Sequence, residues 1–125
     1  MQKKLWLLAT IWLFIAGSAG STLFAQRASC TSLMNAVKEE ADFYDEVSVF
    51  SLLYSEFLEE VKAYEYEDEL FVIAKFKREP GQIFSKSYIF CGISKNRWNS
   101  FKNGWTGTYG ERFHQYIIDY VCDCY

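Results

Sequence analysis

The chain of 125 residues contains a single histidine, and this scarcity limits the chemistry that it can perform. His114 comes directly after Phe113, off the apolar stripe of the helix expected there, so we expect it to face solvent. A histidine that serves nucleophilic catalysis needs a serine or cysteine within hydrogen-bond reach and a carboxylate behind it. The sequence indicates no such trio. We therefore predict that the protein has no catalytic residues and is not an enzyme.

The Cys-x-x-Cys motif is absent, although the chain has four cysteines, Cys30, Cys91, Cys122 and Cys124. A structural zinc site draws its ligands from closely spaced pairs, and Cys30 and Cys91 stand alone. We predict no metal and no cofactor. Redox-active thiols also use that motif, at a helix start that lowers their pKa. Thiol exchange by Cys122 and Cys124 is kept as an alternative to structural bonding.

Positive charge is in short supply, with 13 Lys and Arg against 16 Asp and Glu. Most of the acids lie between Glu39 and Glu69, and most of the bases follow Leu70. We expect an acidic side and a mildly basic side, both solvated. Because a net negative charge repels a phosphate backbone, we do not expect nucleic acid as a partner. Nucleic-acid binding by the basic side is a second alternative.

The N-terminus has the pattern of a secretion signal. Lys3 and Lys4 precede an apolar run from Leu5 to Ala19, and small residues follow. A charged start, an apolar stretch and a small-residue cleavage site make such a signal. We place cleavage after Ala25, and cleavage after Ala19 remains open. An uncleaved anchor is the alternative, because about 20 residues span a bilayer. We expect membrane contact only in that case, and otherwise a secreted or periplasmic protein.

All four cysteines follow this signal, and an even number in a small exported domain indicates disulfide bonds. A bond from Cys122 to Cys124 would close a tight, strained ring. We expect one bond from the C-terminal tail to Cys30 and one to Cys91, with the assignment between the two tail cysteines open. Each bond could contribute about 2–4 kcal/mol.

A helix is predicted after the signal. Thr31 or Ser32 can cap its start, and apolar residues then recur at helical spacing. These residues are Leu33, Val37, Ala41 and Tyr44. The segment 45–55 is ambiguous, because Val47 and Val49 alternate as in a strand whereas Leu52 and Leu53 break that period. Its structure is left undecided.

The middle of the chain predicts a small antiparallel, three-stranded β-meander. The expected strands are Val61 to Tyr66, Leu70 to Lys77, with alternate residues on one face, and Ile83 to Cys91, with Phe84, Tyr88 and Phe90 on one face. The acidic tip Glu67-Asp68-Glu69 separates the first two strands, and the turn dipeptide Pro80-Gly81 precedes the third.

Two short helices are expected to close the chain. Ser94 can cap the first, which Gly104 ends. Thr108 and Glu111 have the spacing of a capping box for the second. A meander with helices on one face, plus an extra N-terminal helix, gives an α+β fold.

A set of aromatic and aliphatic positions follows these elements in order. The positions are Val61, Ala63-Tyr64-Glu65, Leu70, Val72, Phe76, Tyr88-Ile89-Phe90, Trp98, Phe101 and the closing Thr108-x-Gly110-x-x-Phe113-x-x-x-Ile117 element. Together they resemble the KTSC domain, a small domain found at the C-terminus of some lysyl-tRNA synthetases and as a stand-alone bacterial protein. Tyr-x-Phe replaces the family's Tyr-x-Tyr, and the stretch 78–87 looks like a lengthened hairpin.

With the signal peptide at 1–25, the resemblance divides the rest of the chain into an N-terminal helical extension at 26–54 and a KTSC-like domain at 55–125. It implies a fold more than a function, because the family's function is not established and RNA binding has only been suggested for it.

Basic and aromatic residues alternate near the C-terminus, a composition that nucleic-acid binders also use. They are Lys95, Arg97, Trp98, Phe101, Lys102, Trp105, Tyr109 and Arg112. Trp98 and Phe101 fit the buried side of a helix, with the cations on its solvated side. Trp105 lies in a glycine-flanked loop and is the better candidate for an exposed contact. The candidate binding residues are Trp105, Tyr109, Lys102 and Arg97.

The sequence thus predicts an exported, non-enzymatic domain of KTSC-like fold. We expect it to act through a surface contact with a protein, a glycan or an envelope component.

Overall fold

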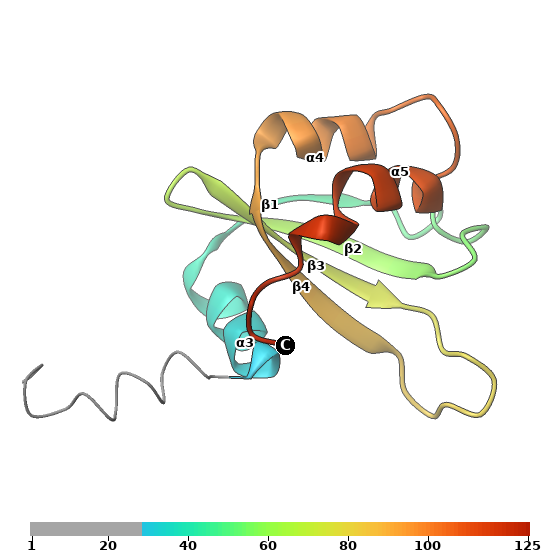
Figure 1. The fold of residues 1–125 in the computed structure, drawn as a ribbon, viewed down its shortest axis with the longest axis horizontal. Helices are drawn as coiled ribbons and strands as arrows, with labels where there is room; N and C mark the ends of the chain where they lie inside the picture. The colour runs from blue at the N-terminus through green and yellow to red at the C-terminus, as the bar shows by residue number, and fades with distance from the viewer. Residues whose placement is uncertain (1–28) are drawn as a thin grey trace, which may run out of the picture.

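The computed structural model describes residues 29–125, so the predicted signal peptide lies outside the described residues. The elements are α3 (Cys30–Glu40), β1 (Asp42–Val47), β2 (Leu58–Tyr66), β3 (Glu69–Phe76), β4 (Lys86–Ile93), α4 (Lys95–Lys102), α5 (Tyr109–Tyr116) and the 3₁₀ turn η1 (Ile118–Tyr120). Figure 1 shows their arrangement. The α+β class predicted from the sequence is confirmed.

The sheet has four antiparallel strands in the order β1-β2-β3-β4, not the three that the sequence predicts. The three expected strands are present as β2, β3 and β4, and β1 is additional. Helical spacing up to Tyr44 suggested that α3 continued, but α3 ends at Glu40. Asp42 then pairs with Glu65 of β2. In β1 only Val47 is buried, so this edge strand lacks the apolar alternation by which strands are recognised.

The start of α3 is also earlier than predicted. The residue that caps it is Ser29, whose Oγ accepts a hydrogen bond from the backbone N–H of Ser32 at 3.2 Å. Thr31 and Ser32, the expected caps, lie inside the first turn. The segment 26–54, predicted as a helical extension, thus contributes both a helix and a strand to the fold.

The helices cover both faces of the sheet rather than one. On one face, α4 and α5 bury Trp98, Phe101 and Phe113 against strand residues such as Val72 and Phe90. On the other face, α3 packs on the alternate strand positions. The buried residues there are Cys30, Met34, Val37, Ile73, Ile89 and Cys122. Figure 1 shows α3 on the side of the sheet away from α4 and α5. The prediction that the helices lie on one face of the sheet is therefore wrong.

The strand β4 begins at Lys86, three residues later than predicted. Ile83 and Phe84 therefore lie in the β3–β4 loop and are exposed, although Phe84 was expected to share a core face with Tyr88 and Phe90. The turn at Pro80-Gly81 is confirmed. The N–H of Gln82 donates to the Glu79 carbonyl oxygen at 3.0 Å, and Gly81 has a φ of 91°.

The undecided segment 45–55 divides into two parts. It contains the end of β1, and from residue 49 it forms turns. Leu52 is fully buried, while Val49 and Leu53 are exposed, so the apolar residues do not share one face. The segment leads from β1 to β2 as a loop at one end of the sheet.

Candidate binding surface at the loop end

Three loops lie at one end of the molecule, which we call the loop end. They are the β1–β2 loop (48–57), the β3–β4 loop (77–85) and the α4–α5 loop (103–108), on the right of Figure 1. The β2–β3 hairpin lies at the opposite end. Because consecutive strands run antiparallel, the β1–β2 and β3–β4 connections must share one end of the sheet.

Large apolar side chains are exposed in all three loops. They are Val49, Phe50, Leu53, Tyr54, Ile83, Phe84 and Trp105. Trp105 is 98% exposed, and Tyr54 is 95% exposed. Single exposed apolar residues are ordinary on a protein surface, but a concentration of them marks an interaction site. The prediction that Trp105 is exposed is confirmed.

Lys77 joins two of the loops. Its Nζ donates to the carbonyl oxygens of Leu53, at 3.1 Å, and Ser55, while its backbone N–H donates to the Phe57 carbonyl oxygen at 2.8 Å. These bonds fix the base of the β3–β4 loop against the β1–β2 loop. The two loops therefore present their exposed side chains from a shared support.

Arg112 holds the α4–α5 loop. Its Nε donates to the Phe101 carbonyl oxygen at 2.8 Å, and its Nη1 donates to the Gly107 carbonyl oxygen at 2.9 Å. Nη1 also lies 3.5 Å from the Thr106 carbonyl oxygen, and the guanidinium stacks over the Tyr109 ring at 4.5 Å. Arg112 is buried. The sequence placed it among surface cations, because charge alone does not reveal that loop carbonyls face inward.

The glycines beside Trp105 are required by the loop backbone. A Cβ at Gly104 would collide with the Ser100 carbonyl oxygen and with the Arg112 side chain. Gly107 has a φ of 75°, where other residues are strained. The loop thus folds tightly on both sides of Trp105, which leaves the indole as its projecting group.

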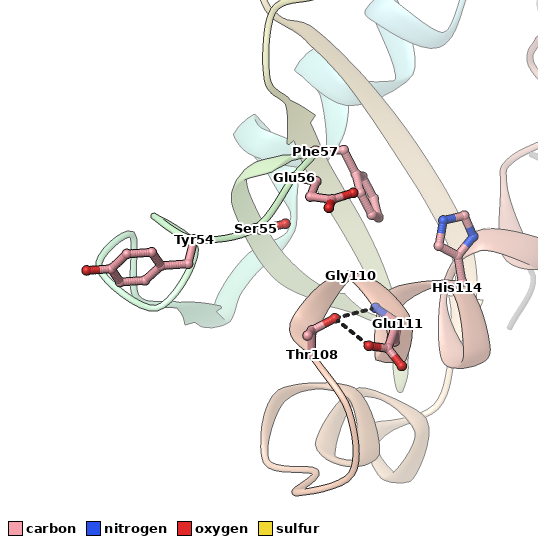
Figure 2. Close-up of a pocket in the computed structure, with 8 residues that line it drawn as sticks. All are labelled: Tyr54, Ser55, Glu56, Phe57, Thr108, Gly110, Glu111 and His114. Carbon is pink, nitrogen blue, oxygen red and sulfur yellow. Dashed lines mark hydrogen bonds between the residues drawn. The ribbon is translucent and has the colours of Figure 1, made fainter.

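The start of α5 shows what the Thr-x-Gly-x-x-Phe element does. Thr108 Oγ1 accepts from the Glu111 backbone N–H at 3.1 Å and lies 3.3 Å from the Glu111 carboxylate (Figure 2). A Cβ at Gly110 would lie 2.9 Å from the Phe57 ring. Phe113 is fully buried. In this element, therefore, Thr108 caps α5, Gly110 allows the Phe57 ring to pack closely against the helix, and Phe113 fills the core.

A hollow of about 400 Å³, with a mixed polar and apolar lining, lies between the β1–β2 loop and α5 (Figure 2). Its lining includes Glu56, Phe57, Glu111 and His114. His114 is exposed, as predicted, and its ring lies 5.2 Å from that of Phe57. Tyr54 also belongs to the lining, and in Figure 2 its ring extends outward from its loop. The loop end thus combines exposed apolar side chains with a recess of mixed lining.

The other predicted binding residues have roles inside the fold. Arg97 donates to the Tyr116 carbonyl oxygen at 3.2 Å and covers the Tyr120 ring. Tyr109 is partly buried, with its ring 5.9 Å from that of Phe101. Neither forms a free patch with Trp105.

Lys102 forms an ion pair with Asp45 of β1 at 2.6 Å. The Trp98 indole also donates to Asp45, at 2.9 Å. Burial alone would raise the pKa of Asp45, but the hydrogen bonds from Lys102 and Trp98 outweigh it and lower the pKa. Lys95 similarly pairs with Glu65 at 2.6 Å. The basic residues of α4 and α5 are therefore engaged within the protein, which weighs against a nucleic-acid surface.

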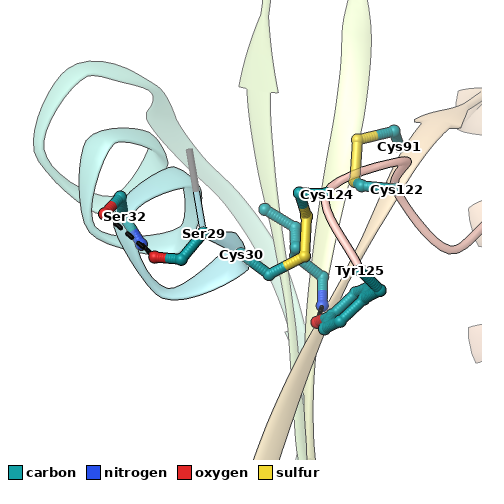
Figure 3. The surroundings of a disulfide bond; sticks show 8 residues. Ser29, Cys30, Ser32, Cys91, Cys122, Cys124 and Tyr125 are labelled. Carbon is teal, nitrogen blue, oxygen red and sulfur yellow. Dashed lines mark hydrogen bonds between the residues drawn. A yellow bond between two sulfur atoms is a disulfide. The ribbon is translucent and has the colours of Figure 1, made fainter. Parts of the chain in front are cut away.

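The tail cysteines form two separate disulfides, Cys30–Cys124 and Cys91–Cys122 (Figure 3). The Cα atoms are 5.1 Å apart in each. The predicted pattern, one bond from the tail to Cys30 and one to Cys91, is confirmed. Tyr125 extends this attachment, because its hydroxyl accepts from the Ile89 N–H at 2.9 Å. Cys122 and Cys124 are thus each bonded to a cysteine outside the tail.

Residues 29–125 contain neither a cluster of metal ligands nor a membrane-spanning helix. No three or more His, Cys, Asp or Glu side chains gather where they could hold a metal ion. No helix in that range is long and apolar enough to cross a membrane.

Comparison with known proteins gives no relative: no family model, no curated protein and no solved structure matches this chain. The resemblance to the KTSC domain therefore stays a prediction.

Proposed function

We propose that the protein is an exported, non-enzymatic binding module of KTSC-like fold, which contacts an envelope component through its loop end. The observation that carries this proposal is the concentration of exposed apolar side chains in three neighbouring loops. Leaving Phe50, Phe84 and Trp105 in water is unfavourable, since burying such a side chain contributes about 1.5–3 kcal/mol. A partner that covers them recovers that free energy.

The construction of the loops supports the same function. Arg112 and Lys77 use charged groups to bind loop carbonyl oxygens, which fixes the backbone beneath the exposed side chains. A surface that is already ordered loses less conformational entropy on binding. The loop end is therefore built as a preorganised contact.

The two disulfides support export. Such bonds form and persist in oxidising compartments and are rare in the cytosol. All four cysteines of the chain are consumed by them, and no cysteine is free. Structural bonding thus accounts for the cysteines without a thiol-exchange activity.

Site-specific photo-crosslinking in the native host tests the proposal. A photoreactive phenylalanine analogue at position 105 should crosslink to an envelope component. The same analogue at Phe43, an exposed aromatic on β1 near the opposite end, should not. Equal crosslinking at the two positions, or none at position 105, would contradict the proposal.

A further inference from the structure

We infer that the envelope component is the lipid bilayer surface, into which the tips of the three loops insert. This inference rests on the proposed function, because it names the partner of the same loop end. The contact that we infer is made by the loop tips and not by a membrane-spanning helix of residues 29–125.

The types of side chain at the tips favour a bilayer. Phe50, Leu53, Ile83 and Phe84 are strongly apolar and exposed, at 76% or more for Ile83 and Phe84. A glycan stacks on flat aromatic rings and gains little from aliphatic tips. Trp and Tyr, by contrast, concentrate at the headgroup level of membranes, where their rings are amphipathic. The combination of Trp105 with exposed Phe, Leu and Ile side chains therefore fits a membrane interface.

The shape of the loop end points the same way. Its exposed apolar side chains project from three separate loops, and Phe50, Phe84 and Trp105 do not line the recess between the β1–β2 loop and α5. A rigid protein partner would need a separate complementary pocket for each projecting tip. The fluid acyl region accepts such tips without preformed pockets.

The acidic end of the molecule lies too far from the loop end to oppose the approach of the loop end to an anionic surface. The end opposite the loops carries a cluster of acids, namely Glu39, Glu40, Asp42, Glu65, Glu67, Asp68 and Glu69. The nine residues of β2 separate the two ends by about 30 Å, at about 3.3 Å per residue. This exceeds the Debye length of about 8 Å at physiological salt, so the acidic end is screened from a membrane at the loop end.

At the loop end itself, opposite charges nearly balance. The bases there are Lys77, Arg78 and Lys86, and the acids are Glu56, Glu79 and Glu111. Lys77 and Arg78 are also hydrogen-bonded to loop carbonyl oxygens. Apolar insertion rather than electrostatic adsorption should therefore drive binding, and its affinity should depend only weakly on salt.

Tryptophan fluorescence with lipid vesicles tests the inference. The exported, oxidised protein is mixed with vesicles of phosphatidylethanolamine containing a minority of phosphatidylglycerol. Trp105 is exposed and Trp98 is buried, so a change on binding reports on Trp105. We expect its emission to shift to shorter wavelength, and lipids brominated on their acyl chains to quench it. No shift and no quenching would overturn the inference.

Substitutions at the tips identify the inserted side chains. Phe84→Ser and Phe50→Ser should each weaken vesicle binding about tenfold or more, because each removes a large apolar group from the bilayer. Phe43→Ser removes an exposed aromatic outside the loop end and should leave binding unchanged. Thermal unfolding of each variant checks that it is folded. Equal losses in all three variants, or a loss of binding at moderate salt, would contradict loop insertion.

The two proposals can fail separately. Crosslinking of position 105 to a protein or a glycan, with no vesicle binding, would overturn the bilayer inference and leave the loop end as the binding surface. No crosslink at position 105 and no vesicle binding would overturn both.

Discussion

At the scale of single residues, Arg112 shows how a buried charged side chain can support an exposed loop to which it does not belong. The guanidinium lies beneath the α4–α5 loop and donates to the carbonyl oxygens of Gly107, in that loop, and of the buried Phe101. Its planar set of donors suits several carbonyl groups at once, which a lysine would not match. The orientation of Trp105 therefore depends on a buried cation from another element.

We predict that Arg112→Met lowers the free energy of unfolding by about 2–4 kcal/mol, because it leaves buried carbonyl oxygens without a donor. Chemical denaturation measures the change. Lys86→Met removes an exposed cation at the start of β4 and should cost less than about 0.5 kcal/mol. Similar effects of the two substitutions would show that Arg112 is not the support of the loop.

Asp45 provides a pH-dependent contribution to stability. Its pKa in the folded protein is below the ordinary value of 3.8, because the bonds from Lys102 and Trp98 favour the carboxylate. The folded state therefore binds the proton less tightly than the unfolded state. The stabilisation is complete above pH 3.8 and is lost as the pH falls through the lower, folded-state pKa.

Asp45→Asn should accordingly cost about 1–2 kcal/mol at neutral pH, and the difference from the parent protein should narrow as the pH falls below about 3.8. Denaturation at a series of pH values measures it. Asp42→Asn, which alters an exposed carboxylate on the same strand, should change stability by less than about 0.5 kcal/mol. A difference that stays constant into strong acid would refute the role given to Asp45.

At the scale of elements, the β2–β3 hairpin makes an unusual choice of turn residues. Tyr66 pairs with Glu69, and the two residues between them, Glu67 and Asp68, have φ values of 51° and 65°. Two-residue hairpin turns with positive φ at both positions normally use Asn-Gly or Asp-Gly. A glycine at Asp68, the second position of the turn, would therefore remove backbone strain.

We predict that Asp68→Gly raises the free energy of unfolding by about 0.5–1 kcal/mol, since glycine adopts positive φ freely. Asp68→Ala removes the same charge but disfavours positive φ, so it should lower stability. Thermal unfolding of the two variants separates backbone strain from charge repulsion. A rise in stability for both would mean that the charge dominates.

Most elements follow from local sequence. Ser94 and Thr108 cap α4 and α5 as the sequence predicts, because capping depends only on the next three residues. The strand β1 could not be found in this way. It is an exposed edge strand, and its stability comes from pairing with β2 rather than from apolar alternation. The start of β4 could not be predicted from local sequence either. Ile83 and Phe84 have the apolar character of core residues, but they lie in the β3–β4 loop.

At the scale of the whole molecule, the disulfides attach both α3 and the C-terminal tail to the sheet. The Cys30–Cys124 bond spans a sequence separation of 94 residues and the Cys91–Cys122 bond one of 31. In the chain-entropy account, a longer closed loop restricts the unfolded chain more. The first bond should therefore contribute more to stability than the second.

Replacing both cysteines of one bond by serine should lower the free energy of unfolding by about 2–5 kcal/mol, with the larger loss for Cys30 and Cys124. Urea denaturation of the two double variants provides the comparison, with the parent protein in reductant as the control. If reductant leaves the parent protein's stability unchanged, the disulfides do not contribute as proposed.

Only part of the loop end could be predicted from the sequence. Trp105 was identifiable because its flanking glycines place it in a loop. Phe50 and Phe84 were not, because the sequence left one in an undecided segment and placed the other in a strand. The antiparallel topology brings the loops that carry Phe50 and Phe84 to one end of the sheet, and α4 then places the loop of Trp105 at that end. No local pattern encodes that arrangement.

Hydroxyl-radical footprinting with mass spectrometry, on the exported protein with and without membranes from its host, tests the central claim most directly. It reports the accessibility of individual aromatic side chains at both ends in one experiment. We predict that membranes protect Phe50, Phe84 and Trp105 from oxidation, while Phe43 and Tyr66 near the acidic end remain as reactive as in the free protein. Protection at the acidic end with the loop end unprotected would contradict the account.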